Sequence, residues 1–216
     1  MTIVLKLGGS VVTEKDAPET VDDAALTRAA DDIAETDEEL VVVHGGGSFG
    51  HHHAAEYGVS TTAGTTNPAG VSAIHGAMKR LNDAVVTALT EKGVAAVPVH
   101  PFSAASRDAD GTLDLPTNQV RTLLAEGFVP VLHGDVVAHR SEGATVLSGD
   151  ELVVELAPAV EADRVGVCST VPGVLDDNGT VIDRITAFDE VASALGGSDA
   201  TDVSGGMMGK VRALLS

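Results

Sequence analysis

The sequence predicts an α/β protein in which helices cover both faces of a mainly parallel central sheet, as in a three-layer sandwich. Short apolar or β-branched runs alternate along the chain with longer segments of helical periodicity. Two of these runs, at residues 5–7 and 41–44, pass directly into glycines. Aromatic residues make up only 2% of the 216 residues, so Val, Leu, Ala and Ile must form most of the core.

Five strands are expected from short β-branched or apolar runs, at residues 2–7, 40–44, 95–99, 129–133 and 164–168. Four helices are expected between them, at residues 22–35, 68–92, 118–126 and 150–157. Residues 103–116 form a polar excursion that fits a hairpin, and DDNG at residues 176–179 is a turn signal. Ligands of such sheets bind at the carboxyl ends of the strands, where both glycine runs and residues 133–135 are expected to converge.

Acidic residues dominate the charge, with 32 Asp and Glu against 13 Lys and Arg and a formal net charge of -19. Duplex nucleic acid and anionic membranes are therefore poor partners. Because about 1 M salt shortens the Debye length to about 3 Å, we interpret this surface as adapted to a salt-rich cytosol; an ordinary acidic protein is the alternative. Cys168 is the only cysteine, no apolar run reaches a membrane helix, and the N-terminus lacks a signal-peptide pattern, so a cytoplasmic location is expected.

The segment VVVHGGGSFGHHHA, at residues 41–54, predicts an anion site. A buried strand that ends in glycines presents backbone N–H groups, and a helix that begins there adds its dipole. His51 is placed to donate a hydrogen bond to the same anion. A metal site is the alternative, but three consecutive histidines do not face one ion on regular structure, and no carboxylate or cysteine is expected at metal-ligand spacing. We therefore expect no metal site and a functional role for His51 alone.

Two lysines and one aspartate are candidates for phosphoryl transfer. Lys6 lies in an apolar strand just before the first glycines, where burial requires a partner; an edge-strand lysine that reaches solvent is the alternative. Lys15 follows in a loop, where solvation is the simpler interpretation. Asp150 lies at the start of a helix behind Ser148. Either residue can cap that helix, or Asp150 can orient lysines around the transferring group.

A third glycine-rich segment, DVSGGMMGK at residues 202–210, puts Lys210 one turn into a helix. Glycines that open a helix before a lysine again make an anion site. The segment is not a P-loop, because Val211 stands where GxxxxGK[ST] requires Ser or Thr.

Taken in order, these segments resemble the motifs of the amino acid kinase family. The matching segments span nearly the whole chain: KLGGS at residues 6–10, HGGGSFGH at 44–51, HGDVV at 133–137, SGDE at 148–151 and DVSGGMMGK at 202–210. The resemblance implies one kinase domain, with a substrate lobe at about residues 1–150 and a nucleotide lobe at about 151–216, and a homodimer. Since residues 211–216 end within a helical pattern, either the protein is short or its nucleotide lobe is incomplete at the C-terminus.

Within this family, the histidine that closes GGGSFGH is a feature in which the chain resembles the members that phosphorylate isopentenyl phosphate. The resemblance implies transfer of the γ-phosphoryl group of ATP, with Mg²⁺ accompanying the ATP, to isopentenyl phosphate, which gives isopentenyl diphosphate and ADP in an alternative mevalonate route typical of archaea. A phosphonate kinase of the fosfomycin type, an acylamino-acid kinase and a non-catalytic nucleotide-sensing module are the alternatives. A sensing module need not keep the groups that transfer a phosphoryl group.

The resemblance also implies residue roles. The catalytic roles fall to cations around the transferring group, the aspartate that organises them and the histidine at the acceptor: Lys6, Lys15, Lys210, Asp150 and His51. The substrate phosphate is held by Gly46, His51 and Gly149. The ATP contacts come from Lys6, Leu7, Gly8, Gly9, Ser10, Gly47, Gly206 and Lys210.

An isoprenoid tail needs an apolar slot, and the helix expected at residues 68–92 offers a stripe at three- and four-residue spacing: Val71, Ile74, Met78 and Leu81. Core packing is the alternative for these four residues. One segment departs from the family pattern. Residues 169–174 read STVPGV where the family commonly has TDVDGV, so contacts to the adenine and ribose are expected to differ.

Overall fold

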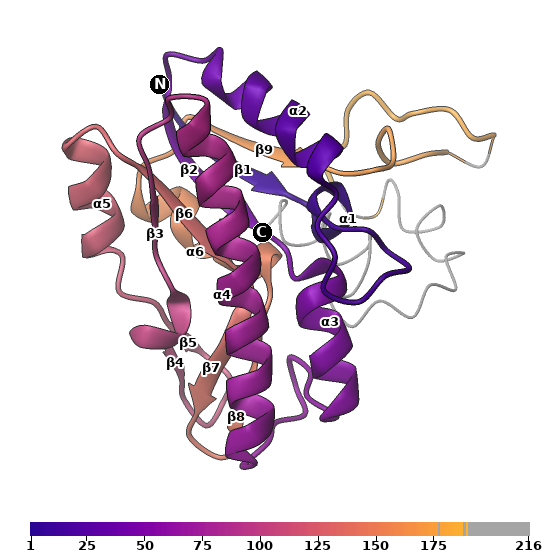
Figure 1. Ribbon diagram of the computed structural model, residues 1–216, viewed down its shortest axis with the longest axis vertical. Helices are drawn as coiled ribbons and strands as arrows, with labels where there is room; N and C mark the ends of the chain where they lie inside the picture. Colours follow the sequence, from indigo (N-terminus) through magenta and orange to yellow (C-terminus); the bar gives the residue numbers. More distant parts are fainter. Residues whose placement is uncertain (177, 188, 190–216) are drawn as a thin grey trace.

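The computed structural model describes residues 1–176, 178–187 and 189, and within them two sheets (Figure 1). The larger sheet is fully parallel, in the order β3-β6-β2-β1-β9. Its strands are β1 (Thr2–Leu7), β2 (Glu39–His44), β3 (Ala96–Pro98), β6 (Val129–His133) and β9 (Arg164–Cys168). All five expected strands are confirmed. Because β6, β2 and β1 are neighbours, their carboxyl ends meet at one edge.

The smaller sheet has the order β5-β4-β7-β8, with β4 (Ser106–Arg107), β5 (Leu113–Asp114), β7 (Asp135–His139) and β8 (Gly143–Leu147). The antiparallel β4–β5 pair confirms the hairpin expected at residues 103–116. The β7–β8 hairpin was not expected from the sequence. It returns the chain so that Leu147 pairs with Asp135, which places residues 148–150 beside the carboxyl end of β6.

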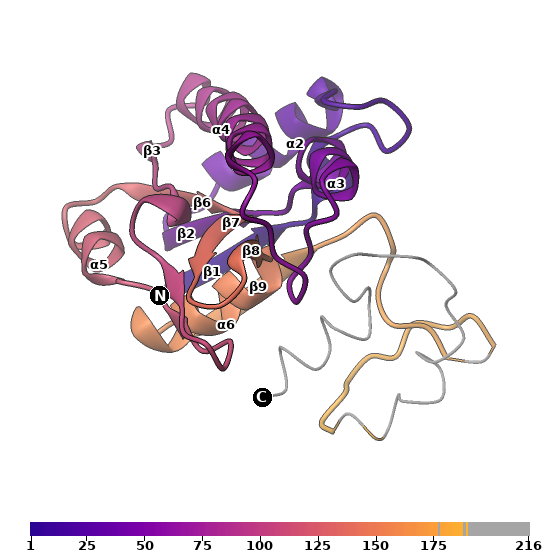
Figure 2. The same ribbon diagram turned by 90° about the horizontal axis from the view of Figure 1, so that it is seen from below.

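Helices cover both faces of the larger sheet, which confirms the three-layer sandwich (Figure 2). One face carries α2 (Asp23–Ala34), α3 (Gly47–Glu56) and α4 (Pro68–Glu91), and the other carries α5 (Asn118–Ala125) and α6 (Gly149–Ala159). A single turn, α1 (Gly9–Val12), follows β1, and a 3₁₀ turn, η1 (Pro101–Ser103), follows β3. The four expected helices are confirmed, with ends that differ by one or two residues.

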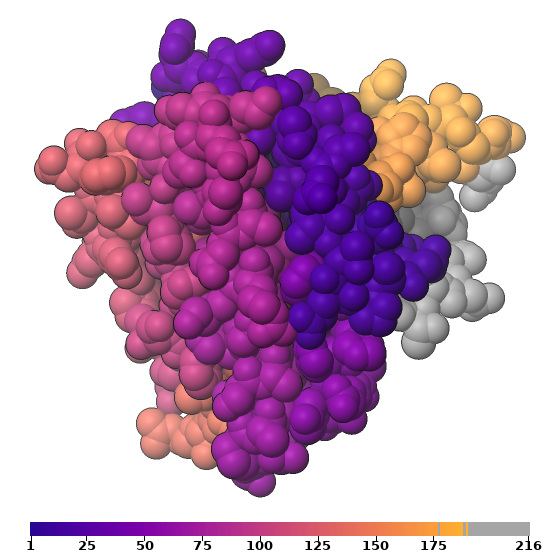
Figure 3. Space-filling model, in the orientation of Figure 1, coloured from indigo at the N-terminus to yellow at the C-terminus, as the bar shows by residue number. Residues whose placement is uncertain are grey.

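Side-chain alternation along β2 divides the core between the two faces. Val42 packs into the cluster formed with α2 and α4, whereas Val41 and Val43 pack into the cluster formed with α5 and α6. Figure 3 shows the first face, where the side chains of α4 and of the N-terminal elements cover the sheet. Among the described residues, no helix is both long and apolar enough to cross a membrane.

The hydrogen bonds at the start of α6 show which of the two candidate residues, Ser148 or Asp150, caps the helix. The Ser148 hydroxyl accepts a hydrogen bond from the Glu151 N–H at 3.2 Å, and the Glu151 carboxylate accepts one from the Ser148 N–H at 2.9 Å. This capping box satisfies two of the amides at the start of the helix. Ser148 is therefore the cap, and the side chain of Asp150 is left to take another partner.

Candidate functional site

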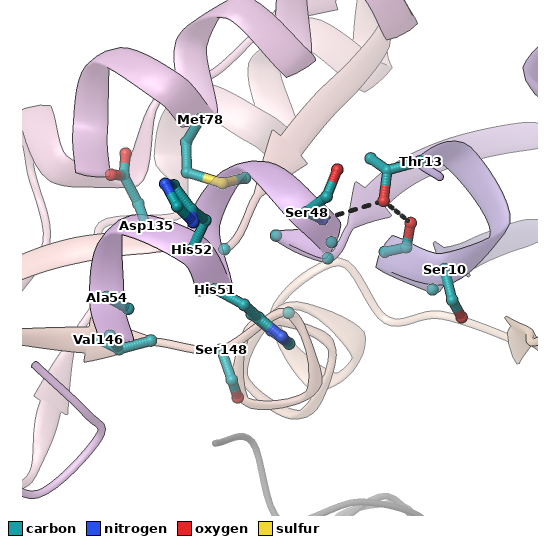
Figure 4. A pocket seen from close by; sticks show the side chains of 18 of the residues that line it. Ser10, Thr13, Ser48, His51, His52, Ala54, Met78, Asp135, Val146 and Ser148 are labelled. Carbon is teal, nitrogen blue, oxygen red and sulfur yellow. Dashed lines mark hydrogen bonds between the residues drawn. The ribbon is translucent and has the colours of Figure 1, made fainter. Parts of the chain in front are cut away.

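A cavity of about 620 Å³ lies at the carboxyl ends of β1, β2 and β6 (Figure 4). Three segments far apart in sequence surround it: the turn after β1, the turn after β2 and the start of α6. Ten residues assigned by the sequence line this cavity: Lys6, Gly8, Gly9, Ser10, Lys15, Gly46, Gly47, His51, Gly149 and Asp150.

Of the three remaining assigned residues, the structure describes only Leu7. The side chain of Leu7 belongs to the core, and its carbonyl accepts a hydrogen bond from the Gly45 N–H at 3.0 Å, so the structure gives it no contact with the cavity. Gly206 and Lys210 lie outside the described residues.

The two glycine turns pack backbone against backbone. A Cβ built on Gly9 would lie 2.2 Å from the Gly47 nitrogen, and Gly47 itself has a φ of +48°. Thr13 joins the turns, since its hydroxyl donates to the Gly9 carbonyl at 2.8 Å and accepts from the Ser48 N–H at 3.0 Å (Figure 4). Only glycine allows this approach, so the two predicted phosphate loops form one continuous surface.

Replacing Gly9 by alanine is expected to separate these turns and to lower kcat by about 100-fold, because a displacement of about 1 Å at a reacting centre has effects of that size. The matched control is Gly76→Ala in the middle of α4, where an added Cβ meets no atom closer than 3.6 Å. That variant should keep its activity and gain about 0.5–1 kcal/mol of stability from helix propensity. Steady-state kinetics and urea unfolding measure both; an active Gly9→Ala variant would contradict the packing argument.

A buried ion pair lies on the floor of the cavity. The Lys6 ammonium is 2.6 Å from the Asp150 carboxylate, with the two side chains 4% and 14% exposed. Gly149 makes room for the pair, since a Cβ there would lie 3.2 Å from Cε of Lys6. The pair joins β1 to the start of α6 across 144 residues of sequence. The interpretation of Lys6 as a solvated edge lysine is therefore wrong, because β1 is internal and the ammonium is buried.

His51 projects from the first turns of α3 into the cavity (Figure 4). Its ring lies against the glycine turn after β2, where a Cβ on Gly46 would be 3.4 Å from the His51 ring. The side chain of His51 is exposed, as is that of Lys15, which lines the rim of the same cavity. Both residues are therefore placed to reach a bound anion.

The other two histidines of the run differ from each other: His52 is exposed and also lines the cavity, whereas His53 does not line it. His53 contacts Glu19 at 2.6 Å and Glu56 at 3.3 Å. Ligand atoms of His52, His53 and Glu56 lie within 4.8 Å of one another, an arrangement that suits a metal ion. This corrects the expectation that no carboxylate accompanies the run at ligand spacing, because Glu56 lies one helical turn from both histidines.

The apolar stripe on α4 divides between the cavity and the core. Ile74 and Met78 line the cavity together with Ala54 and Val146. Leu81 is fully buried in the core, and Val71 packs against the buried cluster that contains Ile74 but does not itself line the cavity. Half of the stripe thus gives the cavity an apolar end, and core packing is the correct interpretation for Leu81.

The sequence analysis missed a network that joins one aspartate lining the cavity, Asp135, to four buried or half-buried histidines: His44, His75, His100 and His133. His75 donates to the Asp135 carboxylate at 2.9 Å, and His100 lies 2.9 Å from His133. Burial raises the pKa of the Asp135 carboxyl and lowers the pKa of the His133 imidazole well below its usual value. The only signal in the sequence is that a histidine directly precedes each turn, in HGGG and in HGD.

His44 should make the protein sensitive to acid. Burial lowers the pKa of its imidazole from 6.5 to about 4. As pH falls from 6.5 towards 4, the unfolded chain binds a proton that the folded chain does not, so stability present at neutral pH is lost, by about 3 kcal/mol from this residue. Urea unfolding at several pH values should show a smaller loss for His44→Asn than for the unchanged protein. Equal losses would show that His44 does not stay neutral.

Together, the parallel sandwich, the joined glycine turns and the buried Lys6–Asp150 pair indicate that the protein is a small-molecule kinase. A model of the amino acid kinase family matches residues 1–216, and the chain belongs to that family.

Within this family, the chain is similar to proteins of one particular activity. The chain is 66% identical to an isopentenyl phosphate kinase from Haloferax volcanii, over 99% of this chain and 87% of that protein. It is 36% identical to an isopentenyl phosphate kinase from Methanothermobacter thermautotrophicus, over 99% of this chain and 85% of that protein. Among solved structures, an isopentenyl phosphate kinase superposes with a TM-score of 0.80 at 31% identity, over 91% of this chain and 85% of that chain.

Proposed function

We propose that this protein transfers the γ-phosphoryl group of ATP to isopentenyl phosphate, giving isopentenyl diphosphate and ADP. The observation that carries the proposal is one cavity with a phosphate-binding surface of glycine turns, a buried lysine on its floor, and an apolar end at Ile74 and Met78. The similarity to isopentenyl phosphate kinases over nearly the whole chain supports the choice of acceptor.

The chemistry needs positioning and charge neutralisation but no covalent intermediate. An oxygen of the acceptor phosphate attacks the γ-phosphorus in line, and the bond to the β-phosphate oxygen breaks. Lys6 neutralises charge on the transferring group, and Asp150 fixes the direction of its ammonium. Lys15 closes over the phosphates from the rim, and Lys210 is assigned to the ATP side.

The two substrates occupy opposite sides of the glycine surface. Gly46, His51 and Gly149 hold the acceptor phosphate, and the isoprenoid tail extends towards Ile74 and Met78. The ATP phosphates take the turn after β1 together with Gly47. Glycines at these positions let phosphate oxygens approach backbone N–H groups that a Cβ would cover. Mg²⁺ bound with the ATP would neutralise charge on the phosphates, and phosphate oxygens would supply most of its ligands.

The protein's environment is also part of the proposal. We infer adaptation to high salt, because the net charge is -19 and a relative at 66% identity comes from Haloferax volcanii. A homodimer is expected from the family, and a cytoplasmic location from the sequence analysis. The alternative mevalonate route is the expected pathway.

The salt adaptation predicts that the midpoint of thermal unfolding rises steadily between about 0.2 M and 2 M KCl, because salt screens repulsion among surface carboxylates. Sucrose at matched osmolality is the control, since it is excluded from protein surfaces but screens no charge. Full stability at low salt would contradict the adaptation without affecting the assigned reaction.

A further inference from the structure

Two buried histidines lie directly beneath the glycine turns. His44 and His133 end β2 and β6 and are partners in the parallel register. Both side chains are fully buried, and their ring centroids lie 5.6 Å apart in a stacked arrangement. Neither lines the cavity, although the glycine after each histidine does. The proposed phosphoryl transfer uses neither imidazole directly, so their positions call for another explanation.

The hydrogen bonds fix which nitrogen carries the proton. Nδ1 of His44 lies 3.1 Å from the Gly45 carbonyl, and Nδ1 of His133 lies 2.9 Å from the Gly134 carbonyl. A carbonyl oxygen only accepts, so each Nδ1 is the donor. Each Nε2 must then accept. His100 supplies the donor for His133, with its Nδ1 2.9 Å from Nε2.

Asn82 of α4 supplies the donor for His44. Its side-chain amide lies 3.0 Å from Nε2, with Oδ1 as the nearer atom, while its Nδ2 is buried and has no partner. Two acceptors face each other in that arrangement. Exchanging the amide oxygen and nitrogen turns Nδ2 to the imidazole and gives Nε2 its donor. This orientation suits a neutral imidazole, consistent with the lowered pKa of His44.

Fixing the Gly45 carbonyl also fixes the next N–H group. In a trans peptide the C=O and N–H bonds point in opposite directions. The Gly45 carbonyl is turned to a ring that lies outside the cavity, so the N–H of Gly46 is turned the other way, towards the cavity that Gly46 lines. The carbonyl of His44 additionally accepts from the Gly134 N–H at 3.0 Å, which holds this end of β2 against β6.

We propose that His44 is a positioning residue for the acceptor phosphate: its neutral imidazole, held by Asn82, locks the Gly45–Gly46 peptide so that the Gly46 N–H is aimed at the phosphate. The inference rests on the proposed role of Gly46 in acceptor binding. His44 touches no substrate and acts only through this peptide.

Kinetics of three variants test the assignment. His44→Leu removes the donor and should raise the KM for isopentenyl phosphate by about tenfold, while the KM for ATP changes by less than about twofold. His44→Asn carries a side-chain N–H near the position of Nδ1 and should recover most of the loss. Asn82→Leu keeps the ring but frees it to turn, so a smaller change in the same direction is expected, and this variant serves if His44→Leu does not fold.

Leu89→Ala in α4 is the control for lost stability, because Leu89 is buried in the core and does not line the cavity. It should lower the unfolding midpoint without changing either KM. If His44→Leu and Leu89→Ala alter the two KM values alike, or if His44→Asn recovers nothing, His44 is only a structural residue and the proposal is overturned.

Amide NMR tests the role of His44 separately from the proposed role of Gly46 in acceptor binding. In the labelled, unchanged protein, isopentenyl phosphate should shift the Gly46 amide resonance, and the shift should be much smaller in His44→Leu at saturating ligand. No shift in the unchanged protein would refute the placement of the acceptor at Gly46, and the positioning role with it. An equal shift in both proteins would leave that placement intact and refute the role of His44 alone.

Discussion

Replacing Lys6 by methionine is expected to lower kcat by about 1,000-fold. The ammonium is buried on the cavity floor, where a fixed cation neutralises transition-state charge far better than solvent does. Methionine keeps the length and the apolar stem of the side chain, so the fold should survive. Single-turnover kinetics with Mg-ATP measure the chemical step. A kcat within about tenfold of the unchanged protein would show that Lys6 does not contact the transferring group.

A double-variant cycle with Asp150→Asn gives the control for this result. Asparagine keeps the shape of the side chain but removes the charge that orients Lys6, so a loss of about 10- to 100-fold is expected. In the Lys6→Met, Asp150→Asn double variant, kcat should be close to that of Lys6→Met alone, because residues that act as one unit are strongly non-additive. Losses that multiply would show that Asp150 acts independently of Lys6.

Replacing His51 by alanine is expected to lower kcat/KM for isopentenyl phosphate by about tenfold to a thousandfold. One charge-assisted hydrogen bond contributes about 1.5–3 kcal/mol, and lost positioning adds to it. The KM for ATP should change little, since the proposed arrangement puts His51, a lining residue of the cavity, on the side of the acceptor phosphate. The comparison is His52→Ala, the next residue of the same helix.

The His52→Ala variant should stay within about threefold of the unchanged protein, because no role on the acceptor phosphate is assigned to it. Equal losses in the two variants would mean that the histidine run acts through its combined charge. Unchanged kinetics in His51→Ala would show that His51 does not touch the acceptor phosphate.

The large sheet could be predicted because its strands are short β-branched runs with clear ends. The β7–β8 hairpin could not. Its strands, DVVAH and GATVL, carry no strong turn dipeptide between them, and the five residues of β7 directly follow a strand and one glycine. Since this hairpin brings Asp150 back beside β1, the sequence named both members of the Lys6–Asp150 pair without showing how they meet.

Site residues could be predicted where the chemistry requires an unusual residue type at its position. Residues that only hold other residues of the site in place could not be predicted. Glycine turns and a lysine within an apolar strand stand out in any sequence. Thr13 does not, because a threonine in a loop has no spacing signal for the two turns it joins. The partnership of His44 with Asn82 depends on how α4 packs against β2, so no local pattern reveals it.

The most direct test is ADP release with Mg-ATP and isopentenyl phosphate in about 2 M KCl, where surface charge is screened. Acetylglutamate, uridylate and fosfomycin are assayed beside it as alternative acceptors. Turnover with isopentenyl phosphate alone is the expected result. Turnover with a carboxylate or phosphonate acceptor, and none with isopentenyl phosphate, would contradict the proposed substrate; binding of ATP without turnover on any acceptor would contradict catalysis itself.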